Sequence, residues 1–472
     1  MEDVTQLAPG QYSVKGEMWN LPGQYEIKSR VGSGAYGCVC KAADKGTGRF
    51  LAVKRIANVF ISKTDALRIL REISILRRLN HPNVISLVDV PRIPPPPAPV
   101  KTMYVVFDFA GTDLHKLVHN GTTLPVDTVR VLMKQMCMGV RYLHHSCVIH
   151  RDLKPANILI DTQSWGLKIA DFGLSRVLEQ GTNSHVCPHL MSSNEDESEA
   201  DHHGDSDGPP KMSRQISEHV VTRWYRAPEV ILCRGHYGYS IDVWSVGCIF
   251  AELLNMATCQ PKTKKRPLFP GRSCFPLSPS SHTCFKDVTD QLNVIFSIIG
   301  TPSQAEIDSL EAGEDVKTYL ARLAPSPPVD LQERFPEAGA DEITILKGMI
   351  EFLAEKRMTL DQALDLPYLA GVDAPVEGVE DHREAPFMLT RKSSAMAAED
   401  LLALDLEHQY DRRNHEEAVK RLSAMFRREI DSLHASESRV KRGAPGSQPQ
   451  GGGGDEFFDC HSPTSGERGQ AV

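Results

Sequence analysis

Apolar residues follow a strand-like spacing over residues 24–93, and one helical stretch interrupts that spacing. Within it, residues 50–56 (FLAVKRI) predict a short apolar strand that carries a single lysine. A helix is expected over residues 62–79, because Ser62 and Asp65 resemble a capping box and Pro82 blocks its continuation. Its apolar residues share one face: Ile69, Leu70, Ile73 and Leu76. These features predict a small, β-rich unit.

From residue 103 onward the spacing changes to a mainly helical period. A strand over residues 103–107 is followed by helical patterns over residues 126–145 and 243–255. Near the end, residues 416–433 predict an amphipathic helix with apolar residues at Val419, Leu422, Phe426, Ile430 and Leu433. We therefore expect an α+β protein in which a larger, α-rich unit follows the small one.

Three segments have compositions that predict extended or disordered chain. Residues 91–99 (PRIPPPPAP) predict a polyproline loop, most simply a linker and alternatively a ligand for aromatic-groove domains. Residues 181–215 include seven acids between Glu195 and Asp207 with no Lys or Arg among them, so they bury too little apolar surface to order themselves. Residues 437–472, with four consecutive glycines, predict a disordered tail.

Composition narrows the class of protein. A chain of 472 residues is expected to form more than one structural unit, and its net charge of −8 argues against a nucleic-acid partner. The 11 cysteines form no C-x-x-C pair and the start of the chain is not basic, which favours a reduced intracellular location in cytoplasm or nucleus. Residues 262–266 (KTKKR) favour a solvated loop over a nuclear signal. No apolar run is expected to span a membrane.

A glycine-rich turn lies between two strand-like runs near the start of the small unit. It consists of Val31, Gly32, Ser33, Gly34, Ala35, Tyr36, Gly37, Cys38 and Val39. Phosphate groups need close backbone approach, which residues without a Cβ permit. A dinucleotide-binding unit would require a helix directly after the glycines, whereas here a strand continues. Alone, the turn is equally compatible with a structural loop.

Lys54 lies in the middle of the apolar strand 50–56. A lysine there is costly unless an acid meets it, and Glu72 on the inward face of the following helix is the expected partner. Considered alone, Lys54 is also compatible with a surface position on an edge strand.

Residues 150–157 (HRDLKPAN) place a carboxylate, an ammonium group and an amide in one short loop, which Pro155 is expected to keep from being helical. Phosphoryl transfer needs a carboxylate to accept the proton of the attacking hydroxyl, a cation beside the γ-phosphate, and oxygen ligands for magnesium. Asp152, Lys154 and Asn157 supply these in turn, and Asp171 of the later Asp-Phe-Gly adds a second magnesium ligand. ATP and Mg²⁺ are the predicted cofactors.

Together these motifs resemble the eukaryotic protein kinase family over residues 25–369, with Ala227-Pro228-Glu229 also in order. The resemblance implies a bilobal protein kinase fold, with an N-lobe over residues 25–110 and a C-lobe over residues 111–369. It implies an activation segment over residues 171–229 and an insert around residues 259–290. Residues 1–24 and 370–436 are then extensions of the kinase core.

The resemblance also implies roles for residues outside the motifs. Asp242 would anchor the catalytic loop, and Arg357 would pair with Glu229. In the nucleotide site, Ala52 would line the adenine pocket while Asp108 and Ala110 present backbone groups to adenine. Phe107 would take the gatekeeper position.

Finer features resemble the MAP kinase branch of the family. Residues 221–226 (VTRWYR) match the sequence that is typical of this branch, as do residues 271–273 (GRS) and 290–292 (DQL). The branch assigns a catalytic role to Thr222. The helix 416–433 resembles the helix that MAP kinases fold back over the small lobe. This branch implies a monomer that phosphorylates serine or threonine followed by proline in protein substrates.

The activation segment departs from that branch. Ser217-Glu218-His219 replaces the usual Thr-x-Tyr, and the acidic insert lengthens the segment. We expect Ser217 to be the regulatory phosphosite of an upstream kinase or of autophosphorylation, and constitutive activity is the alternative. The arginines that the family uses to receive such a phosphate are Arg68, Arg71, Arg151 and Arg176.

A docking surface for partner peptides is a further expectation. Four acids precede residues 385–387 (APF), which resemble a landmark of the branch: Asp373, Glu377, Glu380 and Asp381. They are out of the family's register, so a solvated loop is an equal interpretation.

A pseudokinase and a cyclin-dependent kinase are the two alternatives to a MAP-kinase-like enzyme. A pseudokinase would lack Lys54, Asp152, Asn157 or Asp171, and all four are present. A cyclin-dependent kinase would carry the cyclin-reading helix sequence, which is missing from residues 65–79.

Overall fold

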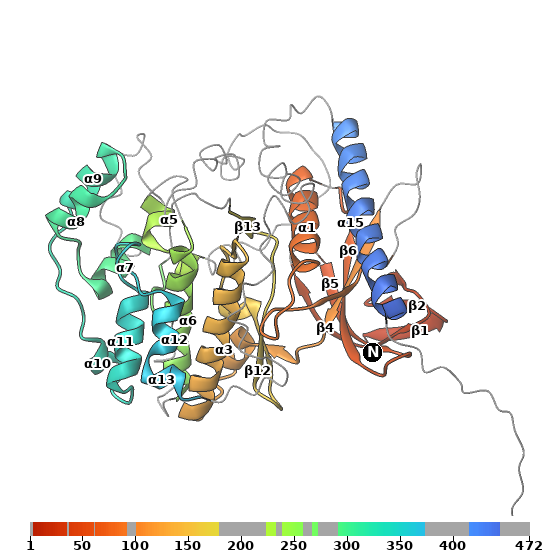
Figure 1. The fold of residues 1–472 in the computed structure, drawn as a ribbon, viewed down its shortest axis with the longest axis horizontal. Coiled ribbons are helices and arrows are strands. Elements are labelled where there is room, and N and C mark those ends of the chain that lie inside the picture. The colour runs from red at the N-terminus through yellow and green to blue at the C-terminus, as the bar shows by residue number, and fades with distance from the viewer. Residues whose placement is uncertain are drawn as a thin grey trace, which may run out of the picture.

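The computed structural model describes residues 3–34, 37–60, 62–91, 101–178, 223–232, 238–257, 267–271, 291–372 and 415–443. Most strands gather at one end of the molecule, and most helices lie toward the other end (Figure 1). The predicted α+β architecture, with a small β-rich lobe and a larger helical lobe, is confirmed.

The small lobe is built on a five-stranded antiparallel sheet in the order β4-β5-β6-β8-β7. Its strands are β4 (Tyr25–Gly34), β5 (Gly37–Asp44), β6 (Phe50–Ala57), β7 (Leu87–Asp89) and β8 (Thr102–Asp108). Side chains of β6 alternate between its two faces, so Leu51 and Val53 are buried on one face and Ile56 on the other. The register places Lys54 between Val39 of β5 and Val105 of β8.

Helix α1 (Lys63–Leu76) packs on this sheet and is shorter than the predicted 62–79. Ser62 is its N-cap, and its side chain accepts a hydrogen bond of 3.0 Å from the backbone N–H of Asp65. The four apolar residues predicted to share one face are all buried, which confirms the predicted helical period. The helix ends six residues before Pro82, sooner than the proline itself requires.

An additional sheet precedes the predicted small lobe and was not foreseen. It contains β1 (Val4–Ala8), β2 (Gln11–Val14) and β3 (Glu17–Asn20), joined by tight turns at Gly10 and Gly16. Tyr12 and Trp19 lie opposite each other on its inner face and are buried with Leu51, Val53 and Val106. Residues 3–20 therefore complete the small-lobe core instead of being a simple extension.

The large lobe is mainly helical. Small strands flank the catalytic region: β9 (Thr112–Asp113), β10 (Val148–Ile149), β11 (Ile158–Asp161), β12 (Gly166–Ile169) and β13 (Arg176–Val177). The helices are α2 (Leu114–His119), α3 (Val126–His145), α5 (Pro228–Leu232), α6 (Ser240–Ala257), α7 (Gln291–Ile299), α8 (Gln304–Ser309), α9 (Glu314–Ala321), α10 (Leu331–Arg334), α11 (Ala340–Met349), α12 (Leu360–Asp365) and α13 (Pro367–Ala370). Two 3-10 turns are η1 (Pro155–Asn157) and η4 (Arg223–Tyr225).

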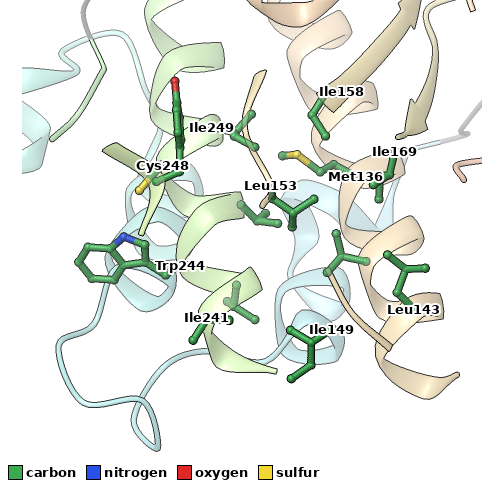
Figure 2. Close-up of a cluster of buried hydrophobic side chains, with 14 of the residues drawn as sticks. Met136, Leu143, Ile149, Leu153, Ile158, Ile169, Ile241, Trp244, Cys248 and Ile249 are labelled. Carbon is green, nitrogen blue, oxygen red and sulfur yellow. The ribbon is translucent and has the colours of Figure 1, made fainter. Parts of the chain in front are cut away.

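Helix α6 is the centre of the large-lobe core. Figure 2 shows Ile249 on the side of α6 that faces α3, whereas Trp244 and Cys248 lie on the other side. The helix is long and apolar enough to cross a membrane by length and composition, contrary to the expectation that no such run exists. Because 83% of that stretch is buried inside the protein, its apolar character is explained by the core.

Helix α15 (His415–Gly443) lies beside α1 on the small lobe, as the resemblance predicted (Figure 1). It is longer than the predicted 416–433 and continues past residue 437, so the prediction of a disordered tail from that residue was wrong for residues 437–443. Phe426 packs edge-on against Phe60 with ring centroids 5.9 Å apart. Glu429 accepts hydrogen bonds from Arg77 at 2.8 Å and Arg78 at 3.1 Å, directly after α1.

Several predictions lie outside the described residues and stay predictions. They concern the proline-rich loop from residue 92, the acidic insert 181–215, the basic segment 262–266, the acids before residues 385–387, and the chain from residue 444. Ala35, Tyr36, Ser217 and Thr222 are also outside them.

Candidate active site

The lysine of β6 and the acid of α1 form the ion pair that the sequence predicts. Lys54 Nζ lies 2.8 Å from Glu72 Oε2, and both side chains are largely shielded from solvent. Burial raises the pKa of the Glu72 carboxyl; Lys54 opposes this shift and Asp171 adds to it. Lys54 thus stabilises a buried carboxylate that would otherwise be costly.

In the catalytic loop, two predicted residues donate hydrogen bonds to the carboxylate of the third, Asp152. Lys154 Nζ donates to Asp152 Oδ2 at 2.7 Å, and Asn157 Nδ2 donates to the same oxygen at 3.2 Å and to the Asp152 carbonyl at 2.8 Å. Because the Asn157 amide nitrogen is used in this way, its amide oxygen is the atom that it can offer to a metal. Contrary to prediction, Pro155 begins the short 3-10 turn η1, since proline is compatible with a first helical position.

Asp242, in the first turn of α6, anchors the catalytic loop, as the resemblance implied. Its carboxylate accepts hydrogen bonds from the backbone N–H of His150 at 2.8 Å and of Arg151 at 2.9 Å. Burial alone would raise the pKa of Asp242, but the bonds and charge of His144 and the N–H of His150 outweigh it and lower the pKa. Arg151 has a left-handed backbone, with φ of 70°, which these two bonds stabilise.

His150 is a positioning residue whose role was not predicted from the sequence, although it is the first residue of the H-R-D motif. Its Nε2 is 3.1 Å from the Ala170 carbonyl, and its ring packs edge-on against Phe172 at 5.0 Å. The Ala170 N–H donates to the Asn157 carbonyl at 2.9 Å. These contacts tie the backbone before Asp171, whose φ is 68°, to the loop that carries Asn157.

The glycines of the glycine-rich turn have different reasons to be glycine. A Cβ on Gly37 would come within 1.8 Å of the Arg55 carbonyl, so the close contact of β5 and β6 requires glycine there. Among the described residues, no atom would lie within 4 Å of a Cβ on Gly32, so on their side the space beside its backbone is open to a phosphate. Phosphate approach therefore explains Gly32 but is not needed to explain Gly37.

Three of the residues predicted to line the adenine pocket lie in β6 and at the end of β8. Ala52 of β6 lies opposite Phe107 in the sheet, and Phe107 is buried as a gatekeeper should be. The Asp108 N–H donates to the Ser86 carbonyl at 3.2 Å, so a contact of Asp108 with adenine stays a prediction that concerns its carbonyl. The Asp108 carboxylate pairs with Arg49 at 2.9 Å and lies 3.8 Å from Lys168.

The four arginines predicted to receive a phosphate lie around the start of the activation segment. Arg71 donates to the Gly173 carbonyl at 3.0 Å, and the Arg68 backbone lies against the same glycine. Arg176 pairs with Ile149 across β13 and β10, two residues before Arg151. Helix α1, the catalytic loop and the segment after Asp171 thus lie close together here, and each carries at least one of the four arginines.

The end of the activation segment is held by an ion pair that the resemblance implied. Arg357 NH1 and NH2 donate to the two carboxylate oxygens of Glu229 at 2.6 and 3.0 Å. The same guanidinium also donates to the carbonyls of Ser240 and Glu351, and it lies 5.2 Å from the ring of Trp244. A fully buried guanidinium is therefore satisfied from several sides.

The donor set fits a magnesium nucleotide. Carboxylate and amide oxygens of Asp171 and Asn157 are the ligands that Mg²⁺ prefers, and Lys54 and the backbone at Gly32 suit phosphate oxygens. Bound Mg²⁺ would neutralise charge on the phosphates of ATP.

Comparison with known proteins agrees with this geometry. The protein kinase domain family matches residues 25–369. Mitogen-activated protein kinase 4 of Oryza sativa subsp. japonica is 34% identical over 364 residues, which cover 77% of this chain and 83% of that protein. Mitogen-activated protein kinase 5 of Arabidopsis thaliana is 35% identical over 371 residues, covering 78% and 83%. The chain therefore belongs to the eukaryotic protein kinases, and it is a serine/threonine protein kinase of the mitogen-activated type that uses ATP and Mg²⁺.

Proposed function

We propose that Asp152 is the catalytic base of this kinase and that the kinase phosphorylates serine or threonine residues that are followed by proline. The observation that carries the first part is the convergence of Lys154 and Asn157 on Asp152 Oδ2, at 2.7 and 3.2 Å. A carboxylate held in this way can accept a hydroxyl proton while an ammonium group stays beside the reacting phosphate.

Each residue of the site has a separate role in the transfer of phosphate from ATP. Asp152 takes the proton of the substrate hydroxyl as the hydroxyl oxygen bonds to the γ-phosphorus of ATP, and the bond to the β–γ bridging oxygen breaks to release ADP. Lys154 offsets charge on the transferred group, and Lys54, set by Glu72, binds the remaining phosphates. Asn157 and Asp171 would hold Mg²⁺, and Asp242 keeps the loop in place.

The preference for proline is supported by residues 220–226, here termed the substrate segment, of which residues 223–226 are described. Trp224 and Tyr225 are held by hydrogen bonds to Gly271, Ser245 and Glu252, so this part has one defined shape. In the MAP kinase family this segment shapes a shallow pocket beside the reacting hydroxyl, which tolerates a residue that lacks an N–H.

A peptide array measures this preference directly. We expect kcat/KM for Ser-Pro peptides to exceed that for matched Ser-Ala peptides by about tenfold or more, the size of one good contact. Equal values for the two series would contradict the proposal, and a Lys54→Met enzyme, which lacks the nucleotide-binding ammonium, gives the background.

Regulation by one phosphate, on Ser217, is the third part of the proposal. The grouping of Arg68, Arg71, Arg151 and Arg176 supports it, because a phosphate of about −1.5 to −2 charges would draw α1 and the catalytic loop together. Such an attraction would favour the Lys54–Glu72 pair.

The test compares wild type, Ser217→Ala and His219→Ala after phosphatase treatment and rephosphorylation. We expect Ser217→Ala to stay near the dephosphorylated activity, whereas His219→Ala should recover fully, because histidine offers no stable phosphate ester. Full activity of Ser217→Ala would show that the enzyme needs no phosphate at this position.

A further inference from the structure

The indole of Trp224 in the substrate segment is held by a residue far away in the sequence. Trp224 Nε1 donates a hydrogen bond of 2.7 Å to the carbonyl of Gly271. A donated N–H of this length fixes the ring plane as well as its position. The place of Trp224 therefore depends on the place of the Gly271 peptide.

Gly271 is fixed in turn by Gln291, the first residue of α7, whose side chain is fully buried. Gln291 Oε1 accepts from the Gly271 N–H at 3.1 Å, and Gln291 Nε2 donates to the Phe269 carbonyl at 3.1 Å. One amide thus holds both ends of the turn 269–271. A Cβ on Gly271 would lie 2.7 Å from Gln291 Cα, so only glycine permits this approach.

A second set of contacts, all from α6, holds the next residue. Ser245 Oγ donates to the Tyr225 carbonyl at 2.8 Å, and the Tyr225 hydroxyl donates to the buried Glu252 at 2.5 Å. Trp244 stacks on Phe269 with ring centroids 5.2 Å apart, which links α6 to the turn that Gln291 holds. The segment is therefore held from α6 and from α7.

We propose that Gln291 is a positioning residue for peptide selection: through Gly271 it sets Trp224, and thereby the pocket for the residue after the phosphorylated serine or threonine. This inference rests on the proposed preference for proline. The hydrogen bonds of Gln291 described above lead to the turn 269–271 and from it to the substrate segment. Its loss should change the use of peptides and leave the use of ATP unchanged.

The test uses two variants in the full-length kinase. Gln291→Met keeps the volume of the side chain and removes both hydrogen bonds, and Trp224→Phe keeps an aromatic ring and removes the N–H. We expect each variant to reduce the ratio of kcat/KM for Ser-Pro over Ser-Ala peptides by about tenfold, with KM for ATP unchanged. The double variant should be little worse than either single one, because both break the same chain of contacts.

Gln135 provides the matched control, since it is an equally buried glutamine whose amide bonds to Asn83 and to the Leu167 N–H in the other half of the lobe. Gln135→Met should lower the melting temperature and leave the peptide ratio unchanged. An equal fall of the ratio in Gln135→Met would mean general destabilisation and overturn the inference.

Three further outcomes are decisive. A wild type that prefers proline together with a Gln291→Met enzyme that keeps the full preference would overturn the inference and leave the proposed function standing. A wild type without preference would contradict the proposed preference for proline and, with it, this inference. If Gln291→Met fails to fold, Trp224→Phe decides alone, and an unchanged ratio in that variant overturns the inference.

Discussion

Replacement of Asp152 by asparagine should lower the rate of phosphate transfer by about 10²–10⁴-fold, because the amide cannot accept the proton of the substrate hydroxyl. The change preserves volume, and the amide can keep an oxygen toward Lys154, which lies 2.7 Å from the present carboxylate. Single-turnover kinetics with saturating ATP measure the chemical step itself.

Two controls accompany Asp152→Asn. ATP affinity and melting temperature should stay close to those of the wild type, since the Lys54–Glu72 pair and the Asp242 anchor are not altered. Near-normal transfer by the variant would show that another group accepts the proton.

Replacement of Arg357 by methionine should destabilise the fold by about 3–5 kcal/mol, the typical cost of removing one partner of a buried ion pair. The guanidinium is fully buried, and its loss leaves the Glu229 carboxylate and the carbonyls of Ser240 and Glu351 without their donor. Chemical denaturation followed by tryptophan fluorescence measures the change in the free energy of unfolding.

Arg141 offers the matched control for Arg357→Met. It forms an exposed pair with Asp361 at 3.4 Å, and exposed pairs typically contribute about 0–1 kcal/mol. Arg141→Met should therefore have little effect on stability. Equal destabilisation by the two changes would mean that burial of the Arg357 pair is not what makes it important.

The catalytic loop could be predicted in detail because its chemistry is local in sequence. Asp152, Lys154 and Asn157 lie within six residues, so any fold that turns the chain here brings them together. The pairing of Lys54 with Glu72 was predictable for another reason: an ammonium in an apolar strand needs an acid, and the helical period placed one acid inward. Asp242 and the Arg357–Glu229 pair came only from the resemblance to the family.

Other features depend on contacts between distant segments, which spacing alone does not encode. The strands of residues 3–20 are stabilised by burying Tyr12 and Trp19 on the small-lobe sheet, and nothing in the local pattern identifies that surface. The same holds for Gly37, which is required by the Arg55 carbonyl of the next strand.

By itself, the sequence determined the reaction class, the residues of the transfer site and the order of the two lobes, since these depend on motifs and periods that are local along the chain. Only the tertiary structure decided how far α15 extends and which contacts hold Trp224 in place. Helix α15 is stabilised by packing against α1, and Gln291 reaches Trp224 through Gly271, so both features depend on free energies of contact between segments far apart in sequence.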